Sequence, residues 1–421
     1  MNSRVSLINR GGVVLALAAA IIIGPTLARG DEPKAPTVDK SLDGLKFGIL
    51  ACIDYSEGDT PLPDGEVQHY NQFGLTRGYF TVEKKFSSRV GARMTMDLSQ
   101  DREDKIKIDD SGANEEYKVT DDLEGSYVMR LKYLYAAFSP DDLGPFTQMK
   151  AEAGMGHMPW LDFEESINLY RCQGTMAVER AGVFNSADLG VSLAGNLGGR
   201  LEDAQAKTGN ARYDGRFGSW HFGVYNGGGY HATEKNQNKV VEGRITLRPL
   251  PDFAPGMQLS YFYLTGQGNT STEHKKDTYW PYYEAQIGML SFESPNVVVT
   301  GQYQAGRGNA KGDWVYHDKR DALAWTGWSA FLNLRRDKLG VFGRYDWFDI
   351  DAQDELIEDG EGAYGLLIYG LSYAPLPGHL IVLAAENIDY QEDAGGRGKL
   401  PVMTNDLGDE RKFQVVYQVK L

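Results

Sequence analysis

The last eleven residues of the chain, 411–421, alternate between apolar and polar side chains. Only Val416 breaks the alternation, and the apolar set is Phe413, Val415, Tyr417, Val419 and Leu421. A period of two predicts a β-strand with one apolar and one polar face. A chain that ends on such a strand is typical of the closing strand of an outer-membrane β-barrel, whose side chains face lipid and lumen in turn.

Sixteen segments of the chain have strand character by the same pattern. Their approximate spans are 44–55, 68–85, 89–98, 125–138, 146–156, 186–196, 212–225, 240–249, 256–266, 279–290, 297–304, 323–335, 339–350, 363–374, 379–390 and 411–421. We therefore predict an all-β fold, an antiparallel transmembrane β-barrel of 16 strands over residues 44–421. The alternative, a soluble sandwich or propeller, would bury Met94 and Met96 against a second sheet, and the chain has no propeller repeat.

The connections between these segments alternate between short and long. Short ones are 86–88, 250–255, 336–338 and 375–378, and long ones are 99–124, 157–185, 305–322 and 391–410. Short periplasmic turns and long external loops are typical of outer-membrane barrels. The segment 197–211 should be a short turn but contains the polar stretch 200–207. Eighteen strands is the alternative, if 99–124 or 197–211 contains a further hairpin.

Aromatic residues are expected at the two membrane interfaces of such a wall. Five of them fall near predicted strand ends, where they would form girdles: Tyr133, Tyr135, Trp347, Tyr373 and Tyr390. Tyr133 and Tyr135 share alternate positions with Met129, which places them on the outward face in this prediction.

The N-terminus has the pattern of a secretory signal. Arg4 and Arg10 precede the apolar run 13–23, which is too short to span a bilayer. We predict a signal peptide over 1–30, cleaved near Ala28 or Gly30, and a periplasmic segment over 31–43. Any spanning structure after it must be a barrel, because no later segment has the apolar length of a membrane helix. The predicted location is the outer membrane of a Gram-negative bacterium, in contact with its lipid.

Composition narrows the function classes. The chain has a formal net charge of −15, which becomes −18 when the three arginines of residues 1–30 are removed. So acidic a chain is a poor binder of nucleic acid. Export makes a disulfide between Cys52 and Cys172 chemically feasible. The sequence does not show that their Cβ atoms approach, so two free thiols are the simpler interpretation. No metal-ligand spacing occurs, so we predict no metal and no cofactor.

Residues 151–230 resemble the phosphate-selective porins O and P. The similar stretches are 153–160 (AGMGHMPW), 170–171 (YR), 186–192 (SADLGVS) and 224–230 (VYNGGGY), with 73–80 (FGLTRGYF) upstream. The resemblance extends in order over most of the mature chain. It implies a water-filled barrel, assembled as a homotrimer, with a lumen that favours anions or other small polar solutes.

Charges on the inward strand faces are the candidate pore lining. Basic residues predicted there are Arg77, Arg93, Arg130, Lys132 and Lys150, joined by Arg244 and Arg344 from later strands. Such a strip lowers the barrier to an anion in a narrow, low-dielectric passage. The same parity places acids inward as well: Asp97, Glu152, Glu242, Glu284 and Asp346. These acids would pair with the cations and brace the wall in the alternative interpretation.

The long connection 157–185 follows the fifth strand, where many trimeric porins fold a loop into the bore. Its apolar residues Phe163, Ile167 and Leu169 would pack on the inner wall. We predict a constriction loop whose named residues are Trp160, Asp162, Glu164, Glu165 and Arg171. The alternative is an external lid with solvated acids. If the acids do face the bore, selectivity could turn cationic.

Two other function classes stay open. A barrel enzyme, such as a lipase or protease, needs a nucleophile with its base or paired carboxylates. The seven histidines lie in no recognised catalytic motif, so we predict that the chain is not an enzyme. A structural or adhesive barrel, whose acidic external loops bind partners, is the other class.

Overall fold

The structure is a computed structural model of the chain. It describes residues 42–62, 66–100, 125–274, 277–316, 321–356, 362–402 and 407–421. The predicted signal peptide and almost all of the segment 31–43 therefore lie outside the described residues.

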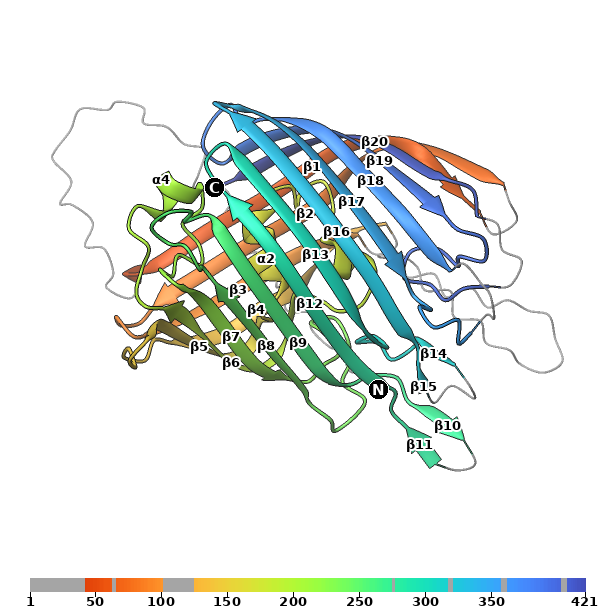
Figure 1. Cartoon of the computed structure of the whole chain (residues 1–421), viewed down its shortest axis with the longest axis horizontal. Helices are drawn as coiled ribbons and strands as arrows, with labels where there is room; N and C mark the ends of the chain where they lie inside the picture. Colours follow the sequence, from red (N-terminus) through yellow and green to blue (C-terminus); the bar gives the residue numbers. More distant parts are fainter. Residues whose placement is uncertain are drawn as a thin grey trace, which may run out of the picture. The chain divides into compact units, whose positions relative to one another are not determined.

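Residues 44–421 form one compact unit, a closed antiparallel barrel of sixteen strands (Figure 1). The predicted fold class is thus confirmed. In barrel order the strands are β1 (Leu45–Pro61), β2 (Val67–Lys85), β3 (Val90–Gln100), β4 (Tyr127–Phe138), β5 (Phe146–His157), β6 (Ala187–Leu197), β7 (Gly218–Tyr225), β8 (Val240–Leu247), β9 (Met257–Gln267), β12 (Tyr282–Glu293), β13 (Val297–Arg307), β16 (Ala324–Arg336), β17 (Leu339–Asp349), β18 (Ala363–Tyr373), β19 (His379–Tyr390) and β20 (Glu410–Lys420).

Two small hairpins stand outside the barrel sheet, and neither adds strands to the wall. They are β10 (Thr272–His274) with β11 (Asp277–Tyr279), and β14 (Val315–Tyr316) with β15 (Asp321–Ala322). The eighteen-strand alternative does not hold, because 197–211 contains a helix and β3 pairs directly with β4. Residues 101–124, where the other extra hairpin was considered, lie outside the described residues.

The C-terminal strand closes the barrel. β20 pairs with β1, and the backbone N–H and C=O of Leu421 both bond to Ile49, at N–O distances of 2.9 and 3.2 Å. Phe413 and Tyr417 are exposed on the outer face, whereas Val416 is fully buried inside. The alternation in the last eleven residues therefore describes this strand correctly, and Val416 is an inward residue of the barrel.

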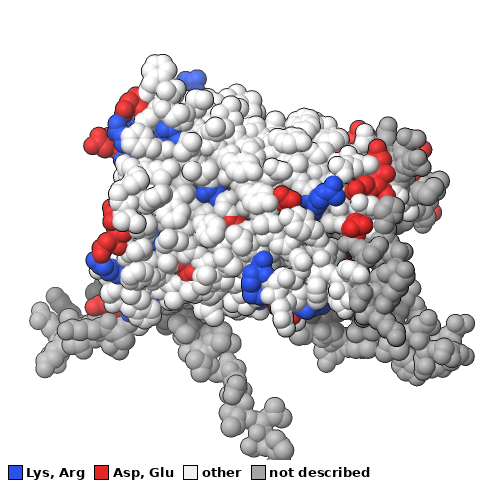
Figure 2. All heavy atoms as spheres, turned by 60° about the horizontal axis from the view of Figure 1, so that its bottom comes forward, with Lys and Arg blue, Asp and Glu red and all other residues white. Residues whose placement is uncertain are grey.

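The outer wall is apolar and exposed. Along β9, Leu259 and Tyr261 are exposed while Ser260 and Phe262 between them are buried. The same outward set includes Leu290, Tyr303, Trp328, Leu332, Tyr369 and Leu371. Figure 2 shows one side of the molecule, where the middle of the wall carries few charges and Lys, Arg, Asp and Glu gather toward the two ends. Such a band is typical of a surface that faces hydrocarbon.

No helix in the described part of the chain has both the length and the apolar character needed to cross a membrane.

A β-bulge reverses the faces of β4. Leu131 and Tyr133 pair with adjacent residues of β3, so Lys132 is an extra residue in the strand. As a result Lys132, Tyr133 and Tyr135 all point inward and are buried. The prediction of Tyr133 and Tyr135 in an outer girdle was wrong, because a bulge shifts the parity of every residue after it.

The other three aromatic positions divide between the faces. Tyr373 is exposed, and Trp347 pairs with Trp328 on the outward face. Tyr390 pairs with the buried Tyr364 and faces the interior, so it belongs to no outer girdle.

β12 reverses the expected relation between polarity and face. Tyr283, Ala285 and Ile287 are fully buried inside the barrel, whereas Glu284 alternates with them on the outward face. The prediction of Glu284 as a lumen acid was wrong. The inward residues of β12 are apolar because they belong to one apolar cluster with residues of the connection after β5, so apolar does not mean outward here.

The two ends of the barrel differ in their connections. Those at the end we call the short-turn end include 86–89, 294–296, 337–338 and 374–378. The exception is 198–217, between β6 and β7, which contains α4 (Ala204–Thr208). At the opposite, long-loop end, residues 158–186 contain α2 (Leu161–Ile167) and α3 (Ala177–Arg180). We call residues 158–186 the inner loop, because α2 lies within the ring of strands in Figure 1.

Gly154 is a position where the wall tolerates a side chain poorly. Its φ is +128°, and a Cβ there would meet the Leu134 carbonyl oxygen and lie 3.0 Å from Tyr135 Cα. We expect Gly154→Ala to lower barrel stability by about 1–3 kcal/mol, because the strained backbone and the clash add. The measurement is thermal unfolding in detergent, followed by electrophoretic mobility. Gly288→Ala is the matched control, since nothing lies within 4 Å of its Cβ position. Equal melting of the two variants would contradict the prediction.

Candidate functional site

The inner loop begins on the inner wall of the barrel. Trp160 is fully buried, with its ring 5.7 Å from Phe262 of β9 and 5.9 Å from Phe163 of α2. Its indole Nε1 donates to the Glu164 carboxylate at 2.8 Å. The apolar face of α2 therefore packs on the wall, as the sequence predicted for Phe163, and Glu164 is buried in that contact.

Tyr170 carries the inner loop to a second part of the wall. Its ring stacks on Phe342 of β17 with the centroids 3.8 Å apart. Its hydroxyl lies 3.0 Å from Asn333 Oδ1 of β16 and 2.8 Å from Ser372 Oγ of β18. The inner loop is thus held by β9 at one point and by β16 to β18 at another, so it crosses the interior of the barrel.

A buried ion-pair cluster anchors the second half of the inner loop. Arg180 of α3 lies 2.8 Å from Glu386 of β19, and Gln173 donates to the same carboxylate at 2.7 Å. Lys412 and Arg397 also approach Glu386, at 3.2 and 3.8 Å. These contacts fix α3 against the strands that close the barrel.

Three further charged residues of the inner loop form their own chain. The Arg171 guanidinium pairs with Glu165, and at 2.7 Å with Glu179. Glu165 keeps about a quarter of its side chain exposed, at 24%. Of the predicted loop residues, Glu165 and Asp162 are therefore the more accessible, at 24% and 23%, whereas Arg171 is 12% exposed. Leu169, predicted to pack, is instead exposed.

Burial changes the titration of the inner-loop acids. Burial raises the pKa of Glu164 to about 7, against the opposing effect of Arg344. Burial, followed by repulsion from Glu179, raises the pKa of Glu165. Burial also raises the pKa of Glu179, against the opposing effect of Arg77 and Lys132. By contrast, Arg212 holds the pKa of Asp162 below its usual range and outweighs the burial of that carboxyl.

Two of the five cations predicted for the basic strip, Arg130 and Lys150, form ion pairs in which the cation is the more exposed partner. Arg130 lies 2.8 Å from Asp97, with exposed fractions of 41% and 8% for the two side chains. Lys150 lies 2.7 Å from Glu152, with 45% and 8%. The acid in each pair therefore sits behind its cation. Arg93 departs from this pattern, because its distant partner Glu83 is the more exposed side chain.

Two cations of the strip have no carboxylate within 4.0 Å among the described residues. Arg77 Nη1 and Lys132 Nζ both donate to the Tyr79 hydroxyl, at 2.9 and 3.0 Å. Arg77 Nε also donates to the Arg171 carbonyl of the inner loop at 3.2 Å. Neutral oxygens thus hold both charges, and the wall beside the inner loop has an excess of positive charge.

Arg244 and Arg344 point inward as predicted, but the inner loop covers them. Arg244 donates to the Pro159 carbonyl at 3.0 Å, and its guanidinium lies 4.1 Å from the centre of the Phe163 ring. Arg344 is paired with Asp346 at 2.7 Å and donates to the Thr175 carbonyl at 3.0 Å. Both arginines fasten the loop from behind and are separated from the strip.

Sequence reasoning missed several residues that the fold brings to the strip. Tyr230 comes from the connection between β7 and β8. Its ring centre lies 5.5 Å from Lys132 Nζ, and its hydroxyl lies 3.4 Å from both Arg130 and Asp97. Arg212 and Tyr213, which contact Asp162, come from the connection 198–217. No local pattern marks these residues, because they lie in irregular connections.

The cysteines, the possible metal ligands and His157 do not form a catalytic or metal site in the described residues. Cys52 and Cys172 are buried free thiols, so the structure contains no disulfide between them. Across the described ranges, no three His, Cys, Asp or Glu side chains are placed to hold a metal ion. His157 lies 2.9 Å from Glu152 and stacks on Tyr133, but among the described residues no hydroxyl or thiol is hydrogen-bonded to its imidazole ring.

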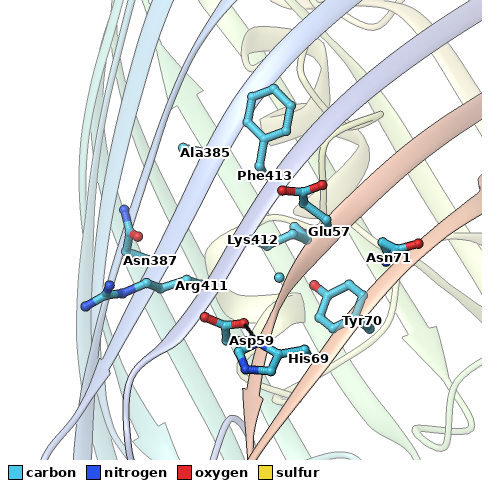
Figure 3. A pocket seen from close by; sticks show the side chains of 11 residues that line it. Glu57, Asp59, His69, Tyr70, Asn71, Ala385, Asn387, Arg411, Lys412 and Phe413 are labelled. Carbon is cyan, nitrogen blue, oxygen red and sulfur yellow. Dashed lines mark hydrogen bonds and ion pairs between the residues drawn. The ribbon is translucent and has the colours of Figure 1, made fainter.

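A surface hollow of about 460 Å³ lies at the long-loop ends of β1, β2, β19 and β20 (Figure 3). Asp59 and His69 form an ion pair within it, beside Glu57 and Arg411. Glu57 pairs across the sheet with the exposed Phe413, which places this edge of the hollow on the outer face of the wall. We therefore do not include it in the candidate passage.

Comparison with solved structures identifies the architecture. The chain is similar to the anion-selective porin from Comamonas acidovorans, with 10% identity, a TM-score of 0.55, and coverage of 90% of this chain and 100% of that one. It is similar to OmpF of Salmonella typhi, solved in complex with daunomycin, with 10% identity, a TM-score of 0.53, and coverage of 89% and 97%. The chain has a porin fold.

These comparisons establish the porin fold and nothing more specific. At such low identity the likeness concerns the fold alone. No protein-family model matches the chain, and no curated protein matches it. The resemblance to the phosphate-selective porins therefore stays a prediction from the sequence.

The acids of the inner loop generate a pH-dependent prediction. Because burial and the neighbouring Glu179 raise the pKa of Glu165 to about 8, this carboxylate takes up a proton as the pH falls through the neutral range, and the lumen loses negative charge. We expect the ratio of anion to cation permeability to rise as the pH is lowered from about 9 to about 6. Reversal potentials in a salt gradient measure this ratio. Glu165→Gln should flatten the dependence, and an equally steep profile in that variant would contradict the assignment.

Proposed function

We propose that this chain is an outer-membrane porin that lets small polar solutes diffuse passively and prefers anions. The closed sixteen-stranded wall with its exposed apolar outer face supports insertion in an outer membrane. Barrels of this size leave an aqueous channel.

The observation that carries the anion preference is the orientation of the ion pairs in the strip. Asp97 and Glu152 are each 8% exposed, whereas Arg130 and Lys150 are exposed at 41% and 45%. A pair of opposite charges has no net charge, but an ion that passes meets the nearer, positive end first. At close range in a medium of reduced dielectric constant, that difference favours anions.

The unpaired cations add to this effect. Arg77 and Lys132 contribute two positive charges that only neutral oxygens contact. The opposing chain Glu165, Arg171 and Glu179 carries one net negative charge when both acids are ionised. The net charge of these described residues around the inner loop is therefore positive.

The inner loop is the proposed constriction. It crosses the interior and contacts the strip at Arg77, whose Nε donates to the Arg171 carbonyl. Solutes would pass beside this contact, along the exposed side chains of Arg130 and Lys150. Phosphate and carboxylates are the natural solutes of this proposal, because the planar guanidinium of Arg130 offers paired donors. The homotrimeric assembly implied by the sequence resemblance belongs to the proposal, and the mass of the detergent-solubilised particle tests it.

Planar-bilayer recording tests the function. We expect discrete conductance steps, and a reversal potential in asymmetric KCl with the sign of anion preference. The double variant Arg130→Gln with Lys150→Gln should lower the ratio of chloride to potassium permeability by about two- to five-fold, because the acids behind the lost cations then face the solute.

Arg89→Gln is the matched control. Arg89 also forms an ion pair, with Asp141, but both residues are exposed near the short turns. It should leave the permeability ratio unchanged. A wild-type protein that inserts but never conducts would overturn the porin assignment, and lipid or peptide cleavage by it would favour the barrel enzyme.

A further inference from the structure

The connection 198–217 is the one described connection at the short-turn end that carries a helix, and we call it the inward turn. Its base is tied to the wall. Arg200 and Gly215 form an isolated β-bridge, and Arg200 also pairs with Asp214 at 3.2 Å. Asn196 of β6 donates to Asp214 at 2.8 Å. With the base fixed in this way, the remaining residues have a defined direction.

The tip of the inward turn reaches α2 of the inner loop. Asn210 donates to the Ser166 carbonyl at 3.0 Å and to Glu293 of β12 at 2.9 Å. The Tyr213 hydroxyl donates to the Asp162 carboxylate at 2.6 Å. Two hydrogen bonds thus join α2, which comes from the long-loop end, to a segment from the opposite end of the barrel.

An aromatic and cationic stack completes this contact. The Tyr213 ring meets the Phe163 ring edge to face at 5.2 Å. The Arg244 guanidinium lies over both rings, 4.1 Å from Phe163 and 5.0 Å from Tyr213. α2 is therefore held between the barrel wall and the inward turn.

The backbone conformation of Tyr213 is further evidence that its contact with the inner loop is specific. Its φ is +50°, in the left-handed region that bulky residues rarely adopt. Such a conformation persists only where the surroundings hold it. Here both the ring and the hydroxyl of Tyr213 are engaged by the inner loop.

The side chain of the preceding residue, Arg212, is exposed, unlike that of Tyr213. Its guanidinium pairs with Asp162, yet its side chain is 54% exposed while that of Asp162 is 23% exposed. This repeats the pattern of Arg130 and Lys150, in which the cation is the accessible partner. The inward turn thus supplies a positive charge beside α2 that no barrel strand provides.

We propose that Arg212 is a specificity-determining residue of the passage, and that Tyr213 and Asn210 position α2 so that the constriction keeps its shape. The proposal rests on the porin function proposed above. In this proposal the inward turn, together with the strip and the inner loop, determines which solutes pass.

The test is the reversal potential of the full-length protein in asymmetric KCl. Arg212→Gln should lower the ratio of chloride to potassium permeability by about two- to three-fold, because Asp162 then remains without its cation. Arg216→Gln is the matched control on the same connection, since Arg216 is 38% exposed and also paired with an acid, Asp252. An unchanged ratio in Arg212→Gln, or an equal change in Arg216→Gln, would overturn the proposal.

Two further variants keep the test decisive if Arg212→Gln fails to assemble. Asp162→Asn retains the Arg212 charge and removes the negative one, so the ratio should rise. Tyr213→Phe keeps the ring and loses the hydroxyl bond to Asp162, so the ratio should be near that of the wild type while brief current interruptions become more frequent. A fall of the ratio in Asp162→Asn, or a steady current in Tyr213→Phe, would contradict the assigned roles.

The outcomes for the two proposals are distinguishable. Absence of any conductance in the wild type refutes the porin function itself. A conducting wild type whose permeability ratio does not depend on Arg212 refutes only this inference. If the wild type proves cation-selective, the shift in Arg212→Gln must still be toward cations.

Discussion

The structure depends on one constraint: in hydrocarbon, every backbone N–H and C=O of the wall must find its partner within the sheet. A sheet satisfies this only when its first and last strands pair, and β1 and β20 do so over most of their length. Closure then divides all side chains into an outer and an inner set. The position of each charged group described above, and so its access to a solute, follows from that division.

Within the closed wall, the inner loop imposes a second rule. Where it packs on β9 and β12, the inward residues are apolar, as Phe262 and Ile287 are. On β8 and β17 it covers the inward arginines Arg244 and Arg344. Where it does not, the inward residues are charged and paired, as Arg130 and Asp97 are. The interior therefore has a dry sector and a wet sector. The inner loop and the strip face each other across the boundary, and the inward turn meets the loop from the other end.

The sequence predicted the fold well because a period of two is a local signal. All sixteen wall strands were predicted, and the closing strand was recognised from its own alternation. The failures have a common physical cause. The parity at Tyr133 depends on a bulge, and the face of Glu284 depends on what covers its neighbours, and neither is encoded in the alternation of a single strand.

The candidate site was less predictable for the same reason. Parity correctly placed Arg77 and Lys132 inward, but it could not show that Arg244 and Arg344 lie under the inner loop. Nor could it find Arg212, which reaches Asp162 of the inner loop, or Tyr230, which approaches the strip, because both lie in irregular connections. The difference between exposed cations and buried acids depends on how deeply each side chain lies in the folded barrel. The alternation of residues along a strand does not encode that depth.

The apolar inner face of β9 and β12 has a consequence for assembly. Without its cover, a band containing Phe262, Leu264, Ile287 and Met289 would line a water-filled bore. Hydrating that band is costly, so docking of the cover and closure of the cylinder are thermodynamically linked. The segment proposed to narrow the bore also supplies much of the hydrophobic core of this protein. Excising it would produce a barrel that no longer completes its folding, and a wide-open version of this channel cannot be reached by simple deletion.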